Sequence, residues 1–208
     1  MKDNFGLYDA LAGMFAGARE SVLTLDEFLA GLQGRSYAFA ILALNIPNCI
    51  PTGIPWLSTI TGVPMLLLLA QFFAGRPVPS LPKAIGRRGL SRGKLQTCLA
   101  RARRSIRWLE DTVHARHEAW VNGIPRRLLL LAWSADILVL ALPIPFDNLF
   151  PAWAILLFCF ALIEDDGVMA MLGWLLTLVT AIWTMFLFMA GHAAIMAVIT
   201  AVQDYLFD

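Results

Sequence analysis

The chain has 208 residues, of which 59% are hydrophobic and only 15% are charged. A soluble domain usually carries about 25% charged and about 45–50% apolar residues, so this composition excludes an ordinary soluble core. We therefore expect an all-α integral membrane protein, and the length suits one compact bundle.

The net charge of +1 conceals an uneven distribution of charge along the chain. Residues 76–127 hold 13 of the 16 lysines and arginines, whereas residues 128–208 hold none and carry seven acids. A nucleic-acid-binding protein would show a basic face without apolar segments on both sides, so we expect no nucleic-acid partner. The positive-inside rule places the basic segment on the cytoplasmic side of the membrane.

Residues 1–35 are amphipathic, and we expect cytoplasmic or interfacial helices there. Thr24 and Glu27 have the spacing of a capping box, which predicts a short helix that begins after Thr24. We expect this helix to end at Gly34.

Residues 36–75 form the first predicted membrane segment and contain no charged side chain. Residues 37–46 would span about 15 Å as a helix, half of a ~30 Å hydrocarbon core. Residues 56–75 are long enough to cross the membrane or to return through it. Residues 45–55 would then be non-helical backbone at membrane depth. The N–H and C=O groups of such backbone need hydrogen-bond partners from protein or from a water-filled cavity.

Residues 76–127 form the basic cytoplasmic or interfacial segment, with a predicted helix that begins near Ser91. Leu95, Leu99 and Ile106 belong to its apolar stripe, and arginines surround that stripe. Two interpretations fit this pattern. The helix lies in the membrane plane, or it belongs to a soluble hairpin that packs on itself.

Residues 128–167 form the second predicted membrane segment, broken at 143–151 and ending in an acidic turn at 164–166 that we expect to be solvated. Residues 168–208 form a C-terminal transmembrane helix and tail. Its first part, residues 168–190, would span ~34 Å as a helix, enough to cross a bilayer. Gly191 is expected to end that helix, and a shorter one follows.

An internal repeat relates the two membrane segments. The run LALNIP at residues 42–47 matches LALPIP at residues 140–145 in five of six positions, and each copy continues with a second proline and a tryptophan. Chance is the alternative, because these residue types are common here. Each copy predicts a re-entrant-like hairpin, parallel or inverted relative to the other, and paired interruptions of this kind mark binding sites in transporter-like folds. The break-forming residues are Pro47, Pro51, Pro55, Pro143, Pro145 and Pro151.

Polar residues in or beside the breaks are the candidates for a substrate or ion path. Ionisable groups at membrane depth are functional by default, although Asp136 could instead bond a partner helix and Asp147 could stabilise a turn. The amide and hydroxyl side chains could equally satisfy unwound backbone. The candidates are Asn45, Asn48, Thr52, Ser58, Thr59, Asp136, Asp147 and Asn148.

The basic residues predict contact with anionic lipid head groups at the cytoplasmic edge, or simple positive-inside anchoring. The residues are Arg76, Arg87, Arg88, Arg101, Arg103, Arg104, Arg107, Arg126 and Arg127. His114 and His117 lie among arginines, which disfavours a metal site. We expect no metal and no cofactor. Because no side chain sits in a recognisable nucleophile setting, we also expect no enzyme activity.

The breaks carry a resemblance to a known family. The helix after Thr24, the prolines and asparagines of residues 45–59, the exit GRPVPSLP at residues 75–82, and PIPFDN at 143–148 with Pro151 resemble the ExoD family of bacterial exopolysaccharide-synthesis proteins. The similarity runs from about residue 25 to about residue 190. The sequence departs from the family pattern at Trp56 and Asp147, where the pattern has a small residue, often glycine.

The resemblance implies a multi-pass protein of the bacterial inner membrane, linked to exopolysaccharide synthesis and to growth in alkaline conditions. Three functions fit it: a transporter-like or lipid-handling protein with its site between the breaks, a non-catalytic assembly or regulatory subunit of a synthase complex, or a proton- or cation-coupled carrier. The expected partners are anionic membrane lipids, a polyprenyl-phosphate-linked glycan, polysaccharide synthase proteins and a second copy of the chain.

Overall fold

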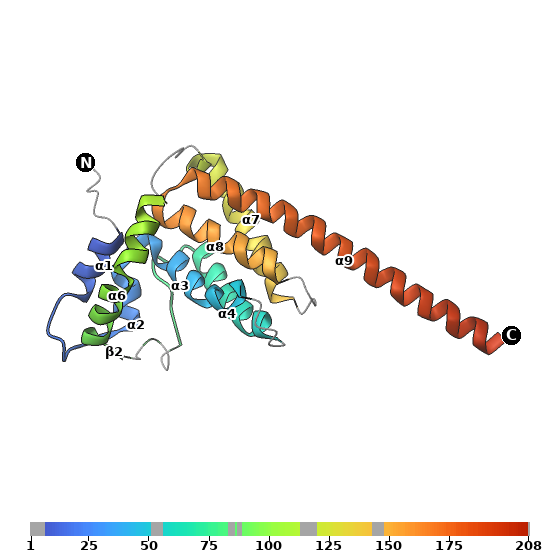
Figure 1. Ribbon diagram of the computed structural model, residues 1–208, viewed down its shortest axis with the longest axis horizontal. Helices are drawn as coiled ribbons and strands as arrows, with labels where there is room; N and C mark the ends of the chain where they lie inside the picture. Colours follow the sequence, from blue (N-terminus) through green and yellow to red (C-terminus); the bar gives the residue numbers. More distant parts are fainter. Residues whose placement is uncertain are drawn as a thin grey trace.

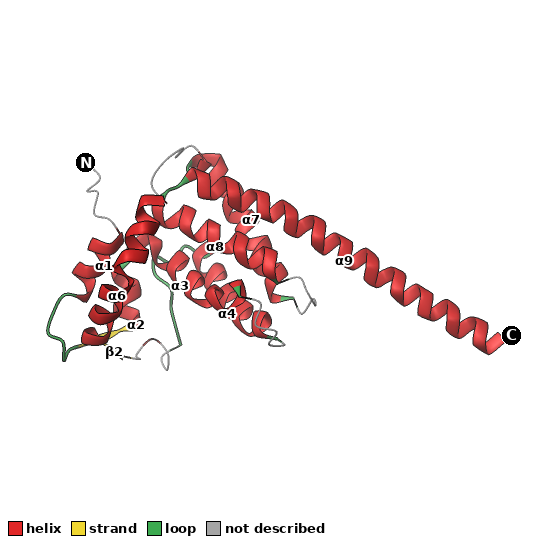
Figure 2. Ribbon diagram, in the orientation of Figure 1, coloured by secondary structure: helices red, strands yellow, loops and turns green. Residues whose placement is uncertain are grey.

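Helices make up most of the protein in the computed structural model (Figures 1 and 2). The structure describes residues 7–50, 56–82, 86, 89–112, 120–142 and 148–207. The elements are α1 (Leu7–Phe15), β1 (Val22–Thr24), α2 (Leu25–Gly31), η1 (Gln33–Arg35), α3 (Ser36–Asn45), η2 (Ile46–Cys49), α4 (Leu57–Phe73), β2 (Gly89–Ser91), α6 (Arg92–Thr112), α7 (Gly123–Ala141), α8 (Leu149–Glu164) and α9 (Gly167–Phe207).

The helices α3, α4, α7 and α8 form a bundle. In the first hairpin α3 packs on α4, and in the second α7 packs on α8. Between the hairpins, α3 contacts α8 and α4 contacts α7. Ile41, Met65, Trp133 and Phe158 are fully buried between them. These helices are long apolar runs. A helix suits such a run because it pairs the N–H and C=O groups of the backbone within itself.

The approach of α4 to α7 depends on a glycine. A Cβ atom at Gly62 would lie 2.7 Å from the Ala141 Cα atom, closer than two carbon atoms approach without moving. Small residues let helices pack backbone to backbone in this way. Gly62 therefore fixes the distance between the two hairpins.

The long helix α9 packs on α8, contacts α7 and then continues past the bundle (Figure 1). The sequence predicted a break at Gly191, and this was wrong, because one helix runs from Gly167 to Phe207. Its segment Gly167–Ala193 is, within the described residues, the one helix long and apolar enough to cross a membrane.

The acidic turn between α8 and α9 was predicted to be solvated, and for Asp166 this was wrong, whereas Glu164 and Asp165 are partly exposed. Asp166 is fully buried, and its Oδ1 atom accepts hydrogen bonds from the backbone N–H groups of Val168 (2.7 Å) and Met169 (3.4 Å). These are two of the N–H groups that a helix start leaves unsatisfied. Asp166 therefore begins α9.

A small unit made of α1, β1, α2, β2 and α6 covers one end of the bundle (Figure 1). We call it the N-terminal unit. In it α1 packs on α6, and β1 pairs antiparallel with β2. Leu11, Phe15, Leu23 and Leu99 form its core, with Leu95 and Ile106 packed against them. Between Leu95 and Ile106 the apolar stripe of α6 is therefore covered by protein. The cover comes from α1 and β1, and the predicted hairpin packing on itself is not what the structure shows.

Side chains of α6 also hold the end of α1. The Arg92 Nη1 atom donates to the carbonyl oxygens of Met14 and Ala16, and Gln96 Nε2 donates to that of Phe15. The predicted capping box is confirmed, because Thr24 and Glu27 exchange hydrogen bonds at the start of α2. The N–H donated by Thr24 lowers the pKa of Glu27. The helix α2 ends at Gly31, three residues before the predicted Gly34.

Candidate functional site

The first break is joined directly to the helix that follows the second break. Asn45 Nδ2 donates a 2.7 Å hydrogen bond to the Ala152 carbonyl oxygen, near the start of α8. Trp153 Nε1 donates in return to the Cys49 carbonyl oxygen at 3.2 Å. The structure therefore brings residues 45–49 and 148–153 together at one end of the bundle.

Amide and hydroxyl groups line the inner side of the first break. Asn45 is fully buried, and Asn48 and Ser58 are nearly so. Asn48 Nδ2 donates to Thr61 Oγ1 at 2.8 Å, and that hydroxyl donates to the Leu57 carbonyl oxygen at 2.9 Å. These bonds connect the turn η2 to the first turns of α4, so part of the polar cluster serves the backbone, as the sequence allowed.

Two buried oxygen atoms near the break have no hydrogen-bond partner within the described part of the chain. They are Asn45 Oδ1 and Thr59 Oγ1. Leaving such an atom unsatisfied costs about 1–3 kcal/mol. The amide oxygen can accept a hydrogen bond, and the hydroxyl can both donate and accept. Each of the two atoms therefore has unused hydrogen-bonding capacity within the bundle.

The other predicted path and break residues have different positions. Asn148 precedes α8 and makes no side-chain capping bond, while Pro151 is buried in the first turn of α8, where a missing N–H costs nothing. Pro47 is exposed in η2. Thr52, Asp147, Pro51, Pro55, Pro143 and Pro145 lie outside the described residues.

Asp136 lies away from the break, in the contact between α7 and α9. It is 1% exposed, and its Oδ2 atom accepts a 2.7 Å hydrogen bond from Thr177 Oγ1. The same hydroxyl lies 3.0 Å from the Gly173 carbonyl oxygen. The alternative reading of Asp136, a bond to a partner helix, describes this contact.

Sequence reasoning missed three groups that shape the break: Thr61, Cys49 and the Trp153 indole. Thr61 lies one helical turn after Ser58, and Trp153 was noted only as part of the repeat. Thr61 could have been predicted from this helical spacing, which places it on the same side of the helix as Ser58. The bond from Trp153 to Cys49 joins residues 104 positions apart, and nothing in the local sequence indicates it.

The predicted lipid-contact residues gather at the other end of the bundle and on the N-terminal unit. Arg76 follows α4, and Arg126 and Arg127 lie in the first turns of α7. The guanidinium groups of Arg103 and Arg107 stand 5.7 and 5.6 Å from the centre of the Tyr8 ring. Arg101 and Arg104 are exposed on α6, whereas Arg87 and Arg88 lie outside the described residues.

The fold thus defines a class of helical protein in which two apolar hairpins, α3 with α4 and α7 with α8, pack together and a basic unit covers one end. This chain belongs to the ExoD family, because the family model described as "Exopolysaccharide synthesis, ExoD" matches residues 7–186. The resemblance seen in the sequence is confirmed, and it links the chain to exopolysaccharide synthesis.

Two relatives share most of the chain. Protein ExoD of Rhizobium meliloti (strain 1021) is 30% identical over 192 residues, which cover 90% of this chain and 80% of that protein. An uncharacterized protein of Synechocystis sp. is 26% identical over 160 residues, 76% of each chain. No solved structure matches the chain.

Proposed function

We propose that this protein handles a lipid-linked intermediate of exopolysaccharide synthesis in the bacterial inner membrane, at a site between the two breaks. The observation that carries the proposal is the pair of buried, unpartnered oxygens, Asn45 Oδ1 and Thr59 Oγ1, at the end where the hairpins are joined. A polyprenyl-phosphate-linked glycan has both an apolar chain for the helices and hydroxyl groups for these oxygens.

The surface of the bundle supports a multi-pass arrangement. The outward side chains of α4 and α7 are large and apolar, among them Ile60, Leu67, Leu131 and Leu138, each more than half exposed. Exposed apolar area of this kind marks a surface that a membrane or a protein covers, and we propose lipid as the cover. The helices α4, α7 and α8 measure roughly 24–28 Å, close to a ~30 Å hydrocarbon core. The basic end would then face the cytoplasm.

Thr59→Val tests the site. The change keeps the shape of the side chain and removes a hydroxyl that makes no hydrogen bond within the described structure, so the protein should accumulate normally. We expect a several-fold loss of exopolysaccharide in a strain that depends on this protein. The matched control is Thr180→Val, because the buried Thr180 hydroxyl bonds only its own helix, at the Leu176 carbonyl oxygen. Normal exopolysaccharide with Thr59→Val would refute the proposed site.

Asp136 supports a second candidate, a proton- or cation-coupled carrier. A carboxyl group buried between apolar helices and bonded to a single hydroxyl is costly to keep charged, and such groups often carry protons or ions. We expect Asp136→Asn, reconstituted in vesicles, to lose pH-dependent ion flux, while Thr177→Val only weakens it. Flux that is the same for Asp136→Asn and the unmodified chain would exclude this carrier.

A further inference from the structure

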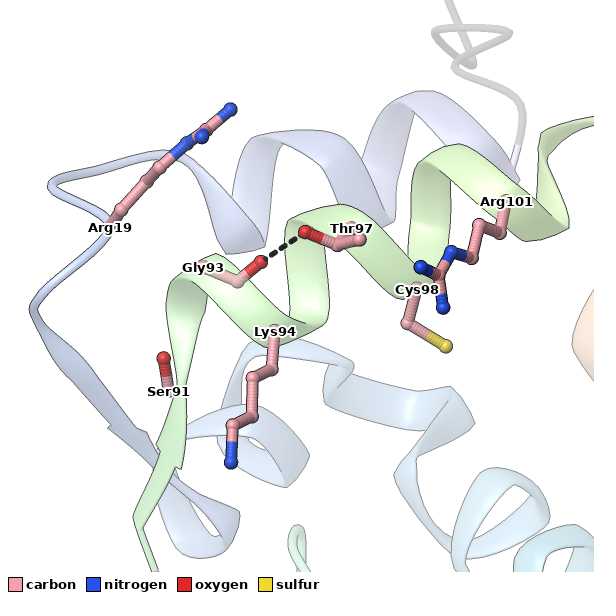
Figure 3. A pocket seen from close by; sticks show the side chains of 7 residues that line it. All are labelled: Arg19, Ser91, Gly93, Lys94, Thr97, Cys98 and Arg101. Carbon is pink, nitrogen blue, oxygen red and sulfur yellow. Dashed lines mark hydrogen bonds between the residues drawn. The ribbon is translucent and has the colours of Figure 1, made fainter.

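The start of α6 borders a hollow of about 480 Å³ that plays no part in the proposed site. Figure 3 shows its lining along one side of α6, with Arg19 on the adjoining loop between α1 and β1. Three of the seven lining residues are cationic and none is acidic. The lining residues are Arg19, Ser91, Gly93, Lys94, Thr97, Cys98 and Arg101.

The backbone fixes where the three cations stand around the hollow, while their side chains point in different directions (Figure 3). Lys94 and Arg101 are seven positions apart on α6, two helical turns, and so share one face. The N–H group of Gly93 donates to the Arg19 carbonyl oxygen at 3.1 Å, and that of Arg92 donates to Ser21 at 3.0 Å. A Cβ atom at Gly93 would lie only 3.0 Å from the Arg19 carbonyl oxygen, so glycine is what lets the Arg19 loop come this close.

Among the described residues, the cations of the hollow have no partner, unlike three other arginines of α6. Arg92 donates hydrogen bonds to the carbonyl oxygens of Met14 and Ala16. Arg103 and Arg107 lie over the Tyr8 ring. Within the described chain, the side chains of Arg19, Lys94 and Arg101 make no hydrogen bond or ion pair. All three are exposed, so their side chains can turn toward an anion that enters the hollow.

We propose that this hollow binds a phosphate group, carried by a lipid head group or free in the cytoplasm. Guanidinium groups match the oxygens of phosphate in paired hydrogen bonds, and a lysine adds a point charge. A phosphate group carries up to two negative charges, which three cations neutralise. The site lies on the basic N-terminal unit, away from the breaks, and does not rest on the proposed function.

Cys98 allows a test on the unmodified full-length protein in detergent. It is exposed in the hollow, whereas Cys159 is buried and Cys49 is partly covered. We expect inorganic phosphate to slow alkylation of Cys98 by N-ethylmaleimide several-fold relative to chloride at equal ionic strength. Phosphatidylcholine vesicles with and without phosphatidic acid form the second arm. Protection by phosphatidic acid identifies a lipid source, and protection by free phosphate alone identifies a soluble one. No protection in either arm overturns the proposal.

Two pairs of variants separate a defined site from general attraction to a basic helix. Lys94→Gln with Arg101→Gln should weaken phosphate binding about 30-fold, at about 1 kcal/mol per cation near a phosphate. Arg103→Gln with Arg104→Gln removes the same charge from the same helix outside the hollow and should leave the binding of inorganic phosphate nearly unchanged. Equal weakening by both pairs would reject the site. Lys94→Arg with Arg101→Lys keeps both charges and should retain binding.

Discussion

At the scale of single residues, Trp56 stands in a backbone conformation that favours glycine. Its φ angle is 66°, in the left-handed region, and its indole is 64% exposed, so packing does not hold it there. A side chain with a Cβ atom costs about 1–2 kcal/mol in this region, and glycine costs almost nothing. The small residue that the resemblance to the family implies at this position would therefore have a physical reason.

We therefore predict that Trp56→Gly is more stable to unfolding than Trp56→Ala by about 1 kcal/mol. Both variants lose the indole, and only the alanine variant keeps the Cβ atom in the left-handed conformation. The free energy of unfolding in mixed micelles measures the difference. Equal stabilities would mean that the backbone at residue 56 relaxes once the indole is gone.

The residues of the site were only partly predictable. Prolines and asparagines predicted an interruption at residues 45–55, and α3 ends at Asn45 while α4 begins at Leu57. The break as predicted stays a prediction, because residues 51–55 lie outside the described residues. The burial of Asp166 and the bond from Trp153 to Cys49 depend on how helices distant in sequence pack. Three consecutive acids in a sequence suggest a solvated turn. One of them can nevertheless accept hydrogen bonds from the free N–H groups at the start of a buried helix.

At the scale of elements, hydrophobic runs located the helices well and their ends less well. The helix predicted from Ser91 begins at Arg92, and the hairpin helices end close to the predicted breaks. The covering of the α6 stripe could not be predicted, because an amphipathic helix fits a bilayer and a protein partner equally. Gly191 did not end α9, because glycine lowers helix propensity by only about 1 kcal/mol and a long apolar helix tolerates that cost.

The contact between α4 and α7 gives a prediction at the same scale. Gly62→Ala adds a Cβ atom against the backbone of α7 and should destabilise the bundle by about 1–3 kcal/mol, the usual cost of overpacking. Gly191→Ala is the matched control, since no atom lies within 4 Å of its added Cβ, and it should be neutral or slightly stabilising. Thermal unfolding of both variants in the same detergent makes the comparison. A Gly62→Ala protein as stable as the control would mean that α4 and α7 are not held this close.

At the scale of the whole molecule, the pairing of helices bears on the internal repeat. If the two hairpins are equivalent, α3 corresponds to α7 and α4 corresponds to α8. The contact of α3 with α8 then has a counterpart in the contact of α7 with α4, and both contacts are present. Any two-fold axis would give this pairing, and the bond from Asn45 to Ala152, which joins the regions of the two breaks, favours an axis along the bundle. The sequence left parallel and inverted copies open, since a matching run at an offset of 98 carries no direction in space. The repeat itself stays a prediction.

The depth of the hairpins yields a final prediction, tested with single cysteines in a chain whose Cys49, Cys98 and Cys159 are replaced by alanine. Trp56 and Arg76 flank α4, which is about 25 Å long, and both are exposed. We expect Trp56→Cys to react with a membrane-impermeant maleimide in intact cells stripped of their outer membrane, and Arg76→Cys to react only in inverted vesicles. A full crossing by α4 requires this result, because the basic end stays cytoplasmic. Reaction of both positions only in inverted vesicles would instead make the hairpin re-entrant, with its broken end reached from the cytoplasm.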